Sequence, residues 1–283
     1  MNMLRTLVLI GFLTALAVSL GYMLGGRSGM IIAFIFSLIT NIGSYWFSAD
    51  IALRANNAQP VSREQAPELY QIVENITKRA NLPMPQVYVI PTAAANAFAT
   101  GRDPEHAAVA VTEGIMRILN WNELEGVLAH EIGHVRNRDI LITSMASVMA
   151  SAVTMIAHWG MYFGSAQGER DRGVNPIFAI LLAVLAPVAA FFIQLAISRS
   201  REYEADSTGA ELCGKPLELA DALRKVDEAA QQRPMQVNPA YSSMYIIKPD
   251  PGNLMVNLCS THPPTAERIR RLEKMAQEIG ARS

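Results

Sequence analysis

Four long stretches of the chain contain no charged residue and are mostly apolar. They cover residues 6–26, 28–49, 140–163 and 174–197. About 20 mostly apolar residues are enough for a helix to cross the hydrocarbon core of a membrane. The four stretches therefore predict a mostly α-helical membrane protein, and they exclude a purely soluble one.

The remaining residues have the composition of a soluble protein. They carry all 24 Lys and Arg and all 25 Asp and Glu, about 26% of their number, as in an ordinary soluble domain. The two cysteines, Cys213 and Cys259, form no CxxC-type pattern, which excludes a disulfide scaffold. A net charge of −1 without a long basic run argues against a nucleic-acid partner.

The short connections between the apolar segments predict two hairpins. The first two segments are joined around residues 25–27, and the last two around residues 168–173. An even number of crossings separates the two soluble blocks, so these lie on one side and can fold together. The predicted parts are an N-terminal transmembrane hairpin (1–49), the first half of the soluble domain (50–139), a second hydrophobic hairpin (140–197) and the second half of the soluble domain (198–283).

Two alternatives concern these segments. The first segment could be a cleaved signal peptide, but its length and the second segment directly after it favour a retained span. The third and fourth segments could dip into the bilayer and return without crossing it. Either arrangement leaves both soluble halves on the same side.

Positive charges near the segment ends predict the orientation. Eight Lys and Arg lie on the side of the soluble halves and three on the other side. Because cytoplasmic flanks carry the excess of positive charge, we expect the soluble part and both termini in the cytoplasm. The expected location is the cytoplasmic (inner) membrane of a bacterium. The eight residues are Arg5, Arg54, Arg63, Arg136, Arg138, Arg199, Arg201 and Lys215.

Local patterns predict the elements of the soluble part. Ser62 and Gln65 have capping-box spacing, so we expect a helix to begin there and to end at residues 81–83. A second helix should begin near Asn120, where Glu123 is a favourable early acid. Strands are expected at 86–90 and 107–111, an extended segment at 96–101, and further helices near 216–231 and 264–279.

The second of these helices carries the motif His130-Glu131-Ile132-Gly133-His134. Residues four apart share one helix face, so the two imidazoles can bind one Zn²⁺ ion. Glu131 is poorly placed to bind the same ion, but it can take a proton from the attacking water and pass it to the leaving amine. Chance gives roughly 0.005 such matches in a chain of this composition. The motif therefore predicts a zinc site on a helix outside the apolar segments.

A catalytic zinc usually has a third protein ligand, and residues 201–206 (REYEAD) offer acidic candidates. This segment follows the fourth apolar stretch, and the zinc helix precedes the third, so both lie at the same membrane face. Glu202 and Asp206 share a helix face, whereas Glu204 points about 200° away from Glu202. We therefore favour Glu202 as the ligand, with Asp206 orienting a zinc-bound imidazole. Glu204 is better explained as a solvated side chain.

Three motifs together resemble the HtpX family. They are HEIGH at 130–134, REYEAD at 201–206 and NAFATG at 96–101. The family comprises membrane-bound zinc metalloendopeptidases, related to CAAX prenyl endoproteases and to soluble gluzincin peptidases. The resemblance covers nearly the whole chain. It implies a cytoplasmic α+β gluzincin-like zinc peptidase domain with a small sheet, formed by the two soluble halves.

The resemblance also implies roles for individual residues. His130, His134 and Glu202 would hold one zinc ion per chain, Glu131 would be the general base and acid, and Asp206 would support a ligand. The segment Asn96, Ala97, Phe98 and Ala99 would be an edge strand that pairs with an extended substrate, because an exposed edge offers main-chain hydrogen bonds. The alternative for this segment is an ordinary surface loop.

A third cluster lies at residues 261–268. By resemblance, His262 would donate a hydrogen bond to the developing oxyanion, and Arg268 would orient it or bind substrate. Taken alone, a histidine before Pro263-Pro264 is better explained by helix entry.

The sequence thus predicts a membrane-integrated zinc endopeptidase. Its expected partners are the lipid bilayer and polypeptides, either membrane proteins or misfolded proteins, in quality control under stress. Three alternatives stay open. A CAAX-type prenyl protease would resemble a longer chain with more spans, and a site-2-type protease would carry its motif inside a span. A non-enzymatic membrane protein with structural zinc would need a fourth protein ligand.

Overall fold

The computed structural model describes residues 2–145, 199–232, 246 and 263–280. The apolar segment 174–197 lies outside these residues, as does 140–163 apart from its first six positions. The prediction of a second hydrophobic hairpin therefore falls outside the described part of the chain.

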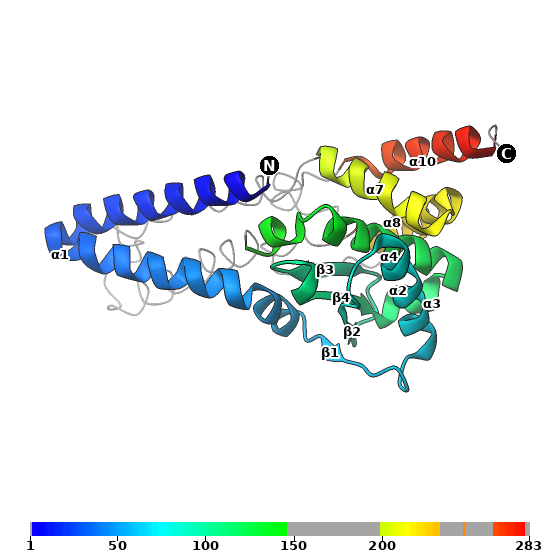
Figure 1. Ribbon diagram of the computed structural model, residues 1–283, viewed down its shortest axis with the longest axis horizontal. Helices are drawn as coiled ribbons and strands as arrows, with labels where there is room; N and C mark the ends of the chain where they lie inside the picture. Colours follow the sequence, from blue (N-terminus) through cyan, green and yellow to red (C-terminus); the bar gives the residue numbers. More distant parts are fainter. Residues whose placement is uncertain (1, 146–198, 233–245, 247–262, 281–283) are drawn as a thin grey trace, which may run out of the picture.

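The first two apolar segments form one long element, helix α1 (Asn2–Ala55), which folds back on itself (Figure 1). The reversal occurs at Gly26, whose φ of 57° lies in the left-handed region that glycine adopts without strain. Across the reversal, a Cβ atom on Gly21 would lie 2.5 Å from the Gly29 carbonyl oxygen. The two legs are therefore in backbone contact near the tip, where a larger side chain would separate them.

A polar contact links the two legs farther from the tip. The Asn41 side-chain amide donates to the Thr14 hydroxyl at 3.1 Å. The leg Gly26–Ala55 is long and apolar enough to cross a membrane, and within the described residues it is the one stretch that meets this test. The structure thus contains a helical hairpin with one candidate span.

The soluble part contains a small mixed sheet in the strand order β1-β2-β4-β3. β2 and β4 run parallel, while β1 and β3 are antiparallel to β2 and β4, respectively. β4 consists of small and β-branched residues and is buried throughout, as expected for a central strand. The strands are β1 (Gln59–Pro60), β2 (Gln86–Ile90), β3 (Ala97–Gly101) and β4 (Ala107–Thr112).

Helix α4 lies against this sheet, with α2 and α3 beside it, and the end of α1 meets the sheet (Figure 1). α4 lies between strand β3 and helices α7 and α8, and α2 also packs against it. Leu124, Val127, Leu128 and Ile132 of α4 are almost fully buried in the apolar core. The described helices of this part are α2 (Pro67–Ala80), the short 3₁₀ turn η1 (Pro104–His106), α3 (Glu113–Ile118), α4 (Trp121–Arg136), α7 (Arg199–Cys213), α8 (Pro216–Gln232) and α10 (Thr265–Gly280).

Helix α2 begins later than the sequence predicts. The Gln65 side chain does accept a hydrogen bond from the Ser62 amide at 2.8 Å, but the pair closes a separate turn. Pro67 disfavours helical geometry in the preceding residue, and Ala66 has φ −140° and ψ 63°. The helix therefore begins at Pro67, because proline is well suited to a first helical position. The expected start at Ser62 is wrong.

Candidate metal centre

Helix α4 is fixed at its start by a capping box and carries the HExxH motif in its buried second half. The Asn120 side chain accepts from the amides of Asn122 and Glu123, and the Glu123 carboxylate accepts from the Asn120 amide. His130 is 1% exposed and Glu131 4% exposed. These polar side chains are therefore held inside the domain, where each must find a partner.

Glycines allow α7 to cross α4 in close contact beside the motif. A Cβ atom on Gly209 would lie 2.7 Å from the backbone nitrogen of His130, and one on Gly133 would lie 3.2 Å from the Ala205 carbonyl oxygen. Side chains at these positions would push the helices apart. The close crossing brings the acidic face of α7 over the histidines of α4.

His130, His134 and Glu202 converge on one point, with ligand atoms that all lie within 4.8 Å of one another. The two Nε2 atoms are 3.2 Å apart. The Glu202 carboxylate oxygens lie 3.8 Å from Nε2 of His130 and 3.6 Å from Nε2 of His134. Ligands in a tetrahedral zinc site with bonds of about 2.0–2.1 Å are about 3.3–3.4 Å apart. The donor set and its spacing therefore fit a zinc ion. Glu204 on the same helix is exposed.

Asp206 and Arg268 form a buried pair behind His130. The Asp206 carboxylate lies 2.9 Å from Nδ1 of His130. Arg268 donates to both oxygens of this carboxylate, at 2.8 and 2.7 Å, and is 2% exposed. Burial alone would raise the pKa of Asp206, but the charge and hydrogen bonds of Arg268 lower it to about 2. Asp206 is thus held ionised, and it can fix the orientation of the His130 ring.

Asp139 contacts the Nδ1 atom of His134, as Asp206 contacts that of His130. The sequence did not lead us to expect this role for Asp139. Its Oδ2 atom lies 3.2 Å from Nδ1 of His134. The chain turns sharply at Arg138, whose φ is 57°, and this turn brings Asp139 back beside the end of α4. The sequence did contain one indication of this contact: Asp139 is an acidic residue three positions after the end of α4. A turn at this place can bring its side chain back to the second histidine.

Glu131 lies beside the convergence point and contacts strand β3. Its Oε2 atom accepts a hydrogen bond from the Ala99 amide at 2.9 Å. Burial raises the pKa of Glu131 to about 8. A carboxyl group whose pKa is raised toward neutrality is suited to accept and return a proton.

Strand β3 is an edge of the sheet, and its outward amides are bound by side chains of the chain itself. The Ala97 amide donates to the Asn96 side chain at 2.8 Å, and the Gly101 amide contacts the Ser144 hydroxyl at 3.3 Å. Ala99 donates to Glu131. The strand is also buried at all five positions, so these residues do not show the exposed edge that the resemblance implied. Ser144 is a further contact that the sequence did not indicate.

The other predicted site residues have different surroundings. Asn96 is buried, and its side chain also accepts from the Ile246 amide at 3.3 Å, so it ties β3 to a distant segment. Phe98 is 1% exposed. Arg268 donates to the Ile246 carbonyl oxygen at 2.8 Å in addition to its bonds to Asp206. His262 lies outside the described residues.

Comparisons with known proteins agree with this geometry. The model of peptidase family M48 matches residues 63–276. The chain is 54% identical over 280 residues to "Protease HtpX homolog" of Pyrococcus furiosus, covering 98% of this chain and 96% of the relative. It is 51% identical over 280 residues to the protein of the same name from Pelotomaculum thermopropionicum, covering 98% and 100%, respectively.

A solved structure, the crystal structure of S. mikatae Ste24p, is 23% identical with a TM-score of 0.49. The match covers 96% of this chain and 65% of that one. The family match spans more than half of the chain, including both halves of the convergent metal group. The chain therefore belongs to peptidase family M48.

Proposed function

We propose that His130, His134 and Glu202 hold one zinc ion per chain and that Glu131 is the general base of peptide-bond hydrolysis. The observation that carries this proposal is the convergence of three ligand atoms at zinc spacing beside a buried carboxyl group. When bound, zinc acts as a Lewis acid toward the scissile carbonyl group and lowers the pKa of a water molecule toward neutrality.

The protein groups have separate tasks in this mechanism. Glu131 takes a proton from the attacking water and delivers it to the leaving amine as the peptide bond breaks. Asp206 and Asp139 hold the two imidazole rings in place through their Nδ1 atoms. Arg268 acts through Asp206 as a positioning residue. His262 is proposed, from the sequence resemblance, to donate to the oxyanion.

Strand β3 is proposed to bind the substrate backbone. The segment Asn96 to Ala99 leads into this edge, and the outward amides of Ala97 and Ala99 already donate to side-chain oxygens. An extended peptide that offers carbonyl oxygens can replace these intramolecular acceptors. Because main-chain atoms make these bonds, the recognition would depend little on the substrate sequence.

The hydrophobic hairpin supports a membrane location. Helix α1 includes a candidate span, and its second leg exposes Ile31, Ile32, Phe34 and Phe36. We propose a multi-pass protein of the cytoplasmic membrane whose peptidase domain faces the cytoplasm. Placement beside the bilayer favours membrane proteins or misfolded proteins as substrates, and hence a role in membrane-protein quality control under stress.

The decisive test compares the detergent-purified chain with its Glu131→Gln variant on an unfolded protein substrate, with zinc content measured in both. We expect both proteins to hold zinc and only the unsubstituted chain to cleave. Cleavage by the Glu131→Gln variant at the unsubstituted rate would reject Glu131 as the base. Zinc in both proteins without cleavage by either would favour structural zinc.

A further inference from the structure

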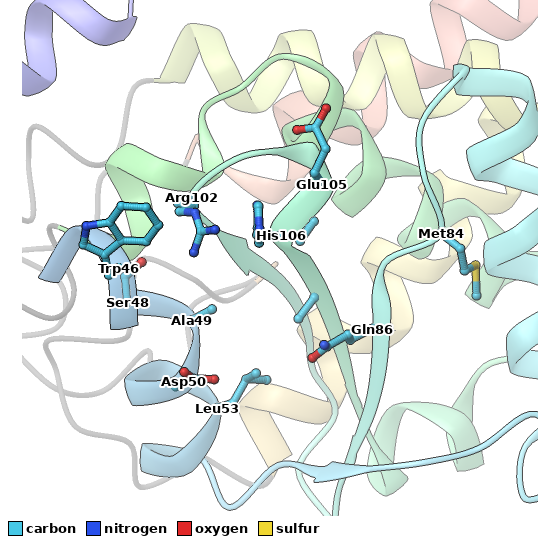
Figure 2. Close-up of a pocket in the computed structure, with 12 residues that line it drawn as sticks. Trp46, Ser48, Ala49, Asp50, Leu53, Met84, Gln86, Arg102, Glu105 and His106 are labelled. Atoms are coloured by element: carbon cyan, nitrogen blue, oxygen red, sulfur yellow. The ribbon is translucent and has the colours of Figure 1, made fainter. Parts of the chain in front are cut away.

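A polar cavity of about 220 Å³ lies where the end of helix α1 meets the sheet (Figure 2). None of its lining residues belongs to the metal group. Ligand pockets for drug-sized molecules have volumes of about 300–1,000 Å³, so this cavity suits a smaller polar group. The polar and aromatic side chains that line it include Trp46, Ser48, Asp50, Arg102, Glu105 and His106.

The cavity lies at the level where helix α1 leaves the apolar part of a membrane. Asp50 is the first charged residue after the charge-free stretch 28–49. The 30 residues of Gly26–Ala55 span about 45 Å, which exceeds the hydrocarbon thickness of about 30 Å. Trp46 is 53% exposed, and tryptophan is typical of the headgroup level. With the membrane location proposed above, this places the cavity at the level of the lipid headgroups.

One cation of the cavity is held in a fixed position beside this tryptophan. The Arg102 guanidinium carbon lies 4.5 Å from the centroid of the Trp46 ring. Its Nε atom lies 3.4 Å from the Asp103 carboxylate. Among the described residues no ion pair is formed by the two terminal nitrogens of Arg102. A guanidinium group fixed in this way can bind a phosphate through two parallel hydrogen bonds.

Two carboxylates line the same cavity from different elements. Asp50 belongs to helix α1 and Glu105 to the turn before strand β4, and Figure 2 shows them on opposite sides of Arg102, with the Glu105 carboxylate turned away from Asp50. Within the described part of the chain, neither carboxylate has a Lys, Arg or His partner in an ion pair. The charged groups of the cavity thus offer an anion site and, separately, a site for a cation.

A buried hydroxyl group adds independent support. Ser48 lines the cavity and is 1% exposed, and its Oγ atom has no hydrogen-bond partner among the described residues. Buried polar groups without a partner are rare in native proteins, and each requires an explanation. A polar ligand in the cavity would supply the missing bond.

We propose that this cavity binds the headgroup of a membrane phospholipid that carries a phosphate and a primary ammonium group, as phosphatidylethanolamine does. Arg102 binds the phosphate, Asp50 binds the ammonium, and the acyl chains follow the apolar surface of helix α1. The proposal rests on the membrane location proposed above. A headgroup with negative charge alone would leave the Asp50 carboxylate uncompensated, so the charges favour the zwitterion.

The test uses full-length protein with the Glu131→Gln substitution, which prevents proteolysis during handling. After delipidation in detergent, native mass spectrometry measures the binding of phosphatidylethanolamine, phosphatidylcholine and phosphatidylglycerol. We expect one phosphatidylethanolamine per chain, bound about tenfold or more tightly than the other two, because a primary ammonium donates hydrogen bonds to carboxylates.

Substitutions in the cavity should have different effects: one should lower the affinity for phosphatidylethanolamine, and the other should remove the selectivity for it. Arg102→Gln should weaken phosphatidylethanolamine binding about tenfold or more, and Asp50→Asn should abolish the preference over phosphatidylglycerol. Arg117→Gln and Asp221→Asn are matched controls, because both residues lie outside the cavity. Asp50 is exposed, so its substitution tests the cavity without disturbing the core.

Three results would overturn the proposal. They are equal binding of the three lipids, unchanged binding in the cavity variants, and binding of inorganic phosphate without retention of lipid. The zinc content of the same samples tests the metal site separately. If the protein holds zinc but binds the three lipids equally, the cavity proposal fails and the proposed zinc site does not. If no sample holds zinc, the proposed zinc site fails and the cavity proposal does not.

Discussion

Glu202 and Glu204 lie two positions apart on helix α7 but in different surroundings. Glu202 is 6% exposed and faces the two histidines, whereas Glu204 faces solvent. Opposite faces for these residues were predicted from the helical angle alone. The chemistry of a carboxylate therefore depends here on helix phase, which places only one of the two at the metal group.

The first prediction follows from this difference. Glu202→Ala should lose zinc, because it removes one of three converging ligands, while Glu204→Ala should keep it as the matched control. The loss of affinity should exceed the 10- to 100-fold change that is typical when an outer-sphere partner is removed. Metal analysis of the two purified variants provides the measurement. Zinc loss in the Glu204 variant alone would reverse the assignment.

Contacts within one helix could be predicted from the sequence, whereas contacts that depend on turns or on tertiary packing could not. The motif spacing predicted that His130 and His134 share a face, because helix geometry is local. Asp139 was missed because its approach to His134 depends on the left-handed turn at Arg138. The bidentate pair that Arg268 forms with Asp206 joins residues 62 positions apart, so its geometry depends on tertiary packing.

Among the elements, the crossing of α4 and α7 determines the geometry of the metal group. The two helices approach with backbone atoms almost in contact at Gly209, and the three residues of the candidate metal group come from both of them. Glycine in a helix interior costs roughly 0.5–1 kcal/mol relative to alanine. The close approach offsets this cost by allowing ligands on two helices to converge.

The second prediction concerns Gly209→Ala. The added methyl group would lie 2.7 Å from the His130 nitrogen, which requires α7 to move. Overpacking of this kind costs about 1–3 kcal/mol, more than the gain in helix propensity. We expect weaker zinc binding and a lower thermal unfolding midpoint. Ser207→Ala is the control, since Ser207 is exposed on the same helix. Unchanged zinc affinity in the Gly209 variant would show that the crossing tolerates displacement.

Local sequence signals predicted most elements well. The strand at 86–90 is confirmed at the same residues, and the helix expected near Asn120 begins at Trp121 with Asn120 as its cap. Both signals are short-range: the apolar residues of a short run, and an acidic residue in the first turn after Asn120. The start of α2 was wrong because two helix-start signals occur close together, and the proline signal prevailed over the capping-box spacing.

For the whole molecule, the distribution of apolar and soluble segments predicts its relation to the membrane. The reversal within α1 brings both ends of that element to the same side (Figure 1). A polar contact between Asn41 and Thr14 links the two legs, as interhelical polar contacts do in membranes. The family assignment was also predicted from the sequence, through three motifs that are far apart in the chain, and it is confirmed.

The third prediction is the topology. The excess of positive charge beside the soluble halves predicts that both termini are cytoplasmic. Reporter fusions at the C-terminus that are active only in the cytoplasm, or only outside it, measure this directly. We expect the cytoplasmic reporter to be active. A signal from the external reporter would reject the proposed orientation and the cytoplasmic location of the peptidase domain.

The division of the metal group between α4 and α7 has a consequence for the biogenesis of the protein. Two ligands are synthesised before the apolar segments 140–163 and 174–197, and Glu202 is synthesised after them. A nascent chain that ends before residue 202 can therefore present only the histidine pair. The peptidase can acquire its complete metal site only after both segments have been made. Synthesis order thus leaves the nascent peptidase without its third candidate ligand until its apolar segments have been made.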